Sequence, residues 1–252
     1  MLFHHKGMMM PNNFLKQVIL RLDFLGEIKL SQQVVNTIRG VVSDSFPEFK
    51  PQEKVLYEMT FEKAQAISKE KRTKAFLFHN NATNSSLSLD PNGITFDIKN
   101  YTTYQDFRDF VQRVIQNLGT ENSSAKTSRI GLRYINQIIF NEGNPFDWVG
   151  LLRDPLTSNL NFIERQNELS RLVGIIELNR SEYFIKFQYG WFNSEYPNPI
   201  AKKEFLLDYD CYSRNETDLS FVLNQVDIYH TAIKELFEYS TLESLKGIMR
   251  GE

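Results

Sequence analysis

Residues 129–140 of this chain read RIGLRYINQIIF, and this stretch decides the fold. Apolar and polar residue types alternate along most of it. One face of an extended strand would carry Ile130, Leu132, Tyr134 and Ile138. The other face would carry Arg129, Gly131, Arg133, Ile135 and Gln137. This alternation predicts a long, half-buried strand at the centre of a sheet.

Two arginines, Arg129 and Arg133, share the more polar face of this strand and are separated by Gly131. At a rise of ~3.3 Å per residue, their Cα atoms lie about 13 Å apart. Glycine leaves the middle of that surface without a side chain. We therefore expect a ligand or partner to lie across it.

The composition is that of an ordinary globular protein with one large domain or two small ones: 252 residues, 41% hydrophobic and 24% charged. The formal net charge of -2 provides no global attraction for nucleic acid, so such binding would need a local basic patch. The 20 Phe and 11 Tyr residues favour broad sheets packed under helices over a helical bundle.

Cys211 is the only cysteine, which rules out an intramolecular disulfide and favours a reducing compartment. No apolar run approaches the ~18 residues of a membrane-spanning helix, and residues 1–10 lack a signal-peptide pattern. We expect a cytoplasmic protein with no membrane partner. Residues 1–13 are expected to form a flexible leader, in which the Met8 to Met10 cluster offers an alternative start.

Residues 14–120 predict a first unit made of a strand, a helix, four strands and a long helix. The strands are expected at 14–24, 54–61, 74–79, 85–89 and 93–98, and the helices at 31–42 and 103–118. Ser31 and Thr103 are the predicted helix caps. Residues 43–51 are expected to form a loop, and the polar stretch 62–73 an exposed hairpin excursion.

Residues 127–252 predict a second unit with the same order of elements and an extra C-terminal helix. A short helix is expected near 146–152, strands at 129–140, 160–166, 172–178, 183–189 and 203–212, and a long helix at 218–239. An aromatic loop at 190–200 contains Trp191 and Tyr196.

The predicted fold class is therefore α+β, with two tandem β-α-β4-α units in the order found in the TATA-box-binding protein. We expect one curved antiparallel sheet with both long helices on one face and the other face partly open. Residues 18–21, VILR, align with residues 130–133, IGLR, which supports an internal duplication.

Three motifs together resemble a sporadically distributed family of uncharacterised bacterial proteins. They are RIGLRYIN at 129–136, LDYD at 207–210, and the helical pattern of His230, Ile233 and Phe237. The resemblance covers nearly the whole chain but is loose at the N-terminus, where Asn12, Asn13 and Lys16 replace the family's proline and acidic residue. It implies no particular activity. It implies a patchy genomic occurrence like that of mobile and anti-phage gene clusters.

Enzymatic candidates are few in this sequence. Asp208 and Asp210 would lie about 6.6 Å apart on one strand face, where two carboxylates can share a metal or divide acid and base roles. Pairing with Arg129 or Arg133 on a neighbouring strand is the alternative that we favour. His230 lies beside an apolar helix stripe and is expected at the core edge. We assign no catalytic residue, metal site or cofactor, and a metal-dependent enzyme stays the third alternative.

We rank two binding functions above a metal-dependent enzyme. In the first, the open face with Arg129 and Arg133 and the loop with Trp191 and Tyr196 bind a protein partner, such as an ATPase or nuclease encoded nearby. In the second, Arg21 joins Arg129 and Arg133 in contacting the phosphates of nucleic acid, with aromatic side chains stacking on bases. The net charge favours the first. The sequence leaves the oligomeric state open.

Overall fold

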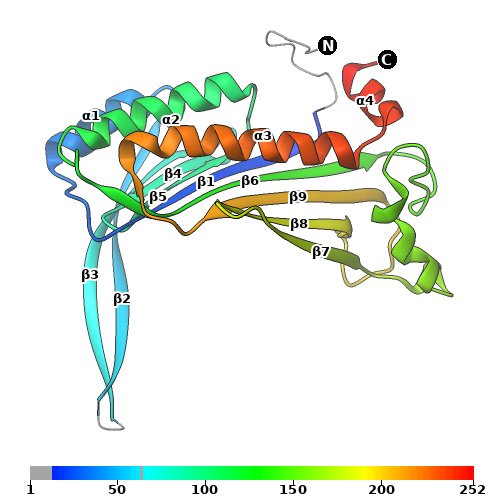
Figure 1. Cartoon of the computed structure of the whole chain (residues 1–252), viewed down its shortest axis with the longest axis horizontal. Coiled ribbons are helices and arrows are strands. Elements are labelled where there is room, and N and C mark those ends of the chain that lie inside the picture. The colour runs from blue at the N-terminus through cyan, green and yellow to red at the C-terminus, as the bar shows by residue number, and fades with distance from the viewer. Residues whose placement is uncertain (1–12, 63–64) are drawn as a thin grey trace.

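The computed structural model describes residues 13–62 and 65–252, so the predicted leader lies, except for residue 13, outside the described residues. The described chain has an α+β fold built on one antiparallel sheet of ten strands (Figure 1). The strand order is β2-β3-β4-β5-β1-β6-β9-β8-β7, with β10 paired to β6. The strands are β1 (Leu15–Phe24), β2 (Glu48–Glu62), β3 (Gln65–Asn80), β4 (Ser85–Asp90), β5 (Gly93–Ile98), β6 (Lys126–Phe140), β7 (Leu172–Asn179), β8 (Phe184–Trp191), β9 (Lys203–Ser213) and β10 (Thr217–Asp218). The helices are α1 (Gln32–Val42), α2 (Tyr104–Gly119), α3 (Val222–Ser240) and α4 (Glu243–Arg250).

Strands β1 and β6 pair antiparallel at the centre of the sheet. Leu20 lies opposite Leu132, and both side chains are fully buried. Along β6 the side chains of Ile130, Leu132 and Ile138 are buried, whereas Arg129 and Arg133 are partly exposed. The prediction of a half-buried central strand at 129–140 is therefore confirmed.

The helices pack their apolar stripes on the sheet and on one another. Ser31 and Thr103 accept hydrogen bonds from backbone amides in the first turns of α1 and α2, as expected for N-caps. Phe110 of α2 contacts both Phe96 of β5 and Phe46, with ring centroids 5.8 Å apart in each pair. α1 packs beside α2, whereas α3 packs on β6 and β9. No described helix has the length and apolar character needed to cross a membrane.

Strands β2 and β3 form a long hairpin that projects away from the rest of the sheet (Figure 1). The β3 strand pairs with β4 only from Phe76 to Asn80, so the outer part of the hairpin is a two-stranded ribbon. The predicted loop at 43–51 is wrong in its second half, because β2 begins at Glu48 and continues through Pro51. An edge strand tolerates this proline, since one side of its backbone needs no ladder partner.

Residues 127–252 depart from the predicted order of elements at two segments. Residues 146–152 form turns in place of the expected helix. The strand expected at 160–166 is replaced by the short 3-10 helices η2 (Ser158–Phe162) and η3 (Gln166–Glu168), which follow η1 (Asp154–Leu156). Local bonds such as Ile163 N to Leu160 O satisfy this backbone without a neighbouring strand.

We expect Leu132→Asp to unfold the protein, because an unpaired carboxylate in this site costs several kcal/mol against a total stability of only ~5–15 kcal/mol. Thermal melting followed by circular dichroism measures the effect. The control is Leu25→Asp, at an exposed position just after β1, which should change the stability by less than about 1 kcal/mol. An unchanged melting temperature for Leu132→Asp would contradict the central position of β6.

Candidate interaction surface

The clearest ion pair on the polar face of the sheet joins β6 to β9. The Arg133 guanidinium donates two hydrogen bonds to Asp208, from Nε to Oδ1 at 2.8 Å and from Nη2 to Oδ2 at 2.6 Å. The Asp208 side chain is only 4% exposed, whereas that of Arg133 is 40% exposed. This bond raises the pKa of Arg133 further. Asp208 therefore neutralises Arg133, which is one of the two pairings with a neighbouring strand that the sequence suggested.

Asp210 lies directly opposite both Arg133 and Lys186 on the neighbouring strands. Burial raises the pKa of Asp210, while the nearby Arg129 and Arg133 oppose that rise. A hollow of about 70 Å³ is lined by Arg133, Lys186, Gln188, Asp208 and Asp210. It has room for only a few waters, at ~30 Å³ each. Among the described residues, no group of three or more His, Cys, Asp or Glu side chains is arranged to hold a metal ion.

The space above Gly131 is filled by an arginine of the same strand. A Cβ atom built on Gly131 would lie 3.1 Å from Nη1 and Nη2 of Arg129. The Arg129 guanidinium also lies 5.3 Å from the Tyr212 ring centroid and 3.9 Å from Asp23. Arg129 therefore folds back over Gly131, so the middle of this surface is covered by a guanidinium group and is not bare as the sequence suggested. The expectation of a ligand or partner across the surface stays a prediction.

Arg21 of β1 lies opposite Gly131, so the structure brings all three predicted arginines onto one sheet face. Its Nε donates to Asp23 at 2.7 Å, and its side chain remains largely exposed. Each arginine thus has a carboxylate within ion-pair distance, and this part of the face offers little uncompensated positive charge to phosphate.

The two aromatic residues predicted to bind a partner do not form one surface. Trp191 ends β8 and is 1% exposed, with its indole N–H donating to the Pro145 carbonyl at 3.0 Å. It is a core residue, because the strand continues farther than predicted and turns the indole inward against Phe205. Tyr196 is exposed, and the Arg171 guanidinium stacks 4.1 Å from its ring centroid.

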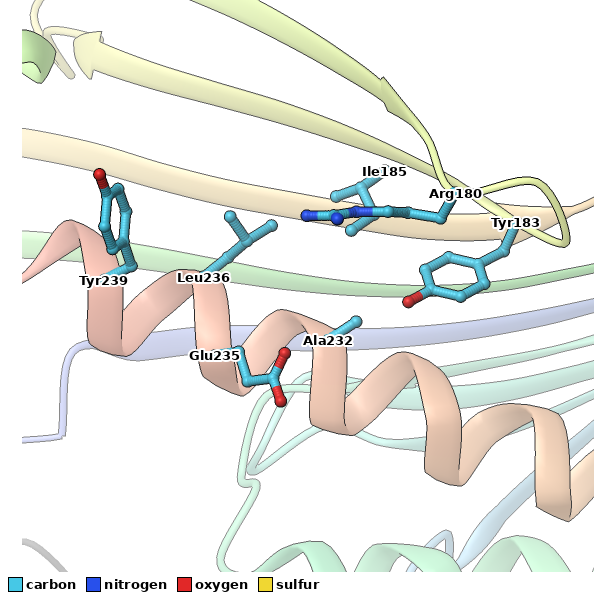
Figure 2. A pocket seen from close by; sticks show the side chains of 7 residues that line it. All are labelled: Arg180, Tyr183, Ile185, Ala232, Glu235, Leu236 and Tyr239. Atoms are coloured by element: carbon cyan, nitrogen blue, oxygen red, sulfur yellow. The ribbon is translucent and has the colours of Figure 1, made fainter.

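A groove between α3 and the β7–β8 turn was not predicted. It encloses about 430 Å³ and is drawn in Figure 2. Three apolar side chains, Ile185, Ala232 and Leu236, contribute to its lining, together with two tyrosines. The complete lining is Arg180, Tyr183, Ile185, Ala232, Glu235, Leu236 and Tyr239. A second hollow of about 370 Å³ continues along α3 and shares Tyr183, Ala232 and Glu235 with the first.

Two opposite charges line this groove, Arg180 from the turn and Glu235 from α3 (Figure 2). Both residues are exposed, and within the described part of the chain neither side chain takes part in an ion pair. The sequence signal for the groove was the unusual width of the apolar stripe on α3, since Ile228 and Tyr239 on the same helix remain exposed.

A polar network joins α2 to α3 and reaches Tyr134 of β6. The rings of Tyr104 and His230 stack with centroids 3.6 Å apart, and His230 Nδ1 lies 2.9 Å from the Tyr134 hydroxyl. Asp227 accepts hydrogen bonds from Tyr104 and from Arg108, the latter at 2.8 and 3.0 Å. His230 is thus held at the core edge by a stacked ring and a hydroxyl.

These features define an α+β protein with a broad antiparallel sheet and an apolar groove at one end. No known protein-family model matches this chain, and no curated protein has a similar sequence. The resemblance drawn from RIGLRYIN and the two downstream motifs therefore stays a prediction.

Arg133→Met should lower the free energy of unfolding by about 2 kcal/mol, because it leaves the buried Asp208 carboxylate without its partner. Urea unfolding measures this loss. The double variant Arg133→Met/Asp208→Leu should recover much of it, since no buried charge remains. Arg21→Met is the control and should cost less than about 1 kcal/mol, because the Arg21–Asp23 pair is exposed. Equal losses for both single variants would contradict this account.

Stability should depend on pH through His230. Burial, aided by the positive charge of Lys234 and opposed by Asp227, lowers the pKa of His230 from 6.5 to about 4. The unfolded chain then binds more protons, so stability is complete above pH 6.5 and falls as the pH drops toward 4. The expected loss is about 3 kcal/mol. His230→Gln should remove that part of the pH dependence in urea unfolding between pH 7 and 4, and an unchanged profile would contradict it.

Proposed function

We propose that this protein acts by binding a partner protein, and that the partner docks in the groove between α3 and the β7–β8 turn. The observation that carries the proposal is an apolar hollow of about 430 Å³ lined also by Arg180 and Glu235, two charges without an ion pair among the described residues. Tyrosine and arginine, both present here, are enriched at the energetic centres of protein interfaces.

Charge distribution favours the groove over the polar sheet face. A partner on that face would have to compete with Asp208 for Arg133, and breaking a pair with one buried member is costly. Arg180 and Glu235 form no ion pair with any other described residue, so a partner would not have to break one. They offer one charge of each sign beside apolar surface, a pattern that favours a protein over a polyanion.

We infer that the two units arose by duplication in the manner of the TATA-box-binding protein, with both long helices on one sheet face. Two features of the topology support this. In each unit the last long strand pairs with the first, β5 with β1 and β9 with β6. The first strands meet antiparallel at the centre. In the first unit α1 packs beside α2, whereas the segment after β6 supplies turns and 3-10 helices, which leaves the outer flank of α3 open.

The resemblance to a sporadically distributed bacterial family extends this proposal. It makes the chain an accessory subunit of a multi-protein system, with anti-phage defence as one such system. An ATPase or nuclease encoded nearby is the partner that we would test first.

Nucleic-acid binding is the second candidate, and one aromatic cluster on the polar face favours it. The guanidinium groups of Arg129 and Arg214 lie 5.3 and 5.8 Å from the Tyr212 ring centroid. Phe184 stacks on Tyr212 at 5.6 Å and is partly exposed. Aromatic rings flanked by arginines are the elements of a stacking site for bases.

Capture of a partner from nuclease-treated lysate tests the first function. Arg180→Glu and Glu235→Lys should each abolish capture while changing the stability by less than about 1 kcal/mol, because both side chains are exposed. The matched control is Lys234→Glu, an exposed charge on α3 outside the groove lining, which should leave capture intact. Equal capture by all three variants would exclude the groove as the docking site.

An oligonucleotide titration at several salt concentrations tests the second function. If the aromatic cluster binds nucleic acid, affinity should fall steeply with salt, and Arg129→Ala or Arg214→Ala should each reduce that slope by about one phosphate contact. Partner capture that disappears with nuclease treatment would support this function over the first.

A further inference from the structure

Strand β7 forms one edge of the sheet and exposes apolar side chains on both of its faces. It pairs only with β8 in the described sheet. Val173 and Ile175, on the polar face of the sheet, are 37% and 56% exposed, and Ile176, on the opposite face, is 40% exposed. An edge strand with apolar residues on both faces is a ready template for another strand.

The opposite edge of the sheet is protected by the usual devices, and β7 is not. Strand β2 carries Pro51 and several charged residues over its first half, including Lys50, Glu53 and Lys54. A proline and charged side chains prevent unwanted strand pairing. The β7 sequence, LVGIIELN, contains no proline, lysine or arginine, and Glu177 is its only charge. Of these two edge strands, β7 is therefore the one whose sequence allows another strand to pair with it.

We propose that β7 pairs antiparallel with β7 of a second copy of this chain, so that one sheet continues through a two-fold axis perpendicular to it. This pairing would satisfy the outward-facing N–H and C=O groups of β7, for which the described residues provide no partner. It would also cover Val173 and Ile175 on one face and Ile176 on the other. The dimer uses the strand edge, and therefore does not depend on the proposed groove.

The sequence around β7 is self-complementary in one register, with Gly174 on the two-fold axis. Because antiparallel partners share a face, only residues of equal parity can lie opposite one another. Centring on Gly174 places Val173 opposite Ile175 of the second copy and Arg171 opposite Glu177. Centring on Ile175 would place Val173 opposite Glu177, an apolar residue against a charge. Charge and apolar matching thus select the Gly174 register.

The mass of the protein in solution is the first test. Analytical ultracentrifugation of the full chain should give a dimer of twice 29.5 kDa that dissociates on dilution. Ile175→Lys should weaken dimerisation at least tenfold without unfolding the chain, because residue 175 is exposed in the protomer. The control is Phe162→Lys, which changes a side chain of η2 that is 91% exposed and should leave the dimer intact. A monomeric wild-type protein, or a dimer that Ile175→Lys does not weaken, would overturn the proposal.

Cysteine cross-linking tests the register, because Cys211 is the only natural cysteine and is buried. Mixing Val173→Cys with Ile175→Cys should give a disulfide-linked heterodimer under mild oxidation. Each variant alone should cross-link far less, since identical positions are then offset along the strands. Efficient cross-linking of Ile175→Cys with itself would instead overturn the Gly174 register.

Discussion

Antiparallel pairing of β1 with β6 is the constraint on which the rest of this structure depends. It places Leu20 against Leu132 in the core and orients all strands that follow on either side. Because a shift of one residue would turn every buried side chain of β6 to the opposite face, this register also decides where Arg129 and Arg133 lie. The polar surface is therefore a direct consequence of the central core.

That polar surface is neutralised largely within the sheet. Arg133 is bound by the buried carboxylate of Asp208, and Arg129 folds over Gly131 toward Tyr212 and Asp23. A carboxylate buried as deeply as Asp208 needs such a partner, because an unpaired buried charge is strongly destabilising. The arginines thus stabilise the pairing of β6 with its neighbours. In the groove beside α3, by contrast, Arg180 and Glu235 remain without an ion pair among the described residues.

Differences between the two ends of the sheet explain where binding is proposed. At the first end α1 packs beside α2, and the edge strand β2 is protected by Pro51 and charged residues. At the second end the chain between β6 and β7 forms turns and 3-10 helices, so α3 has an open flank and β7 an unprotected edge. The predicted helix at 146–152 does not form, and β7 lacks proline, lysine and arginine. Two separate surfaces are therefore available at this end, the groove beside α3 and the edge of β7.

The sequence by itself determined the central strand, the caps at Ser31 and Thr103 and the antiparallel α+β class, because alternation and capping are local patterns. Only the tertiary structure decided that Trp191 lies in the core, that Arg129 fills the space above Gly131, and that residues 160–166 form no strand. The groove likewise joins segments some fifty residues apart, from the β7–β8 turn to α3. Side-chain direction at a strand end and contacts between distant segments depend on neighbours that local sequence patterns do not specify.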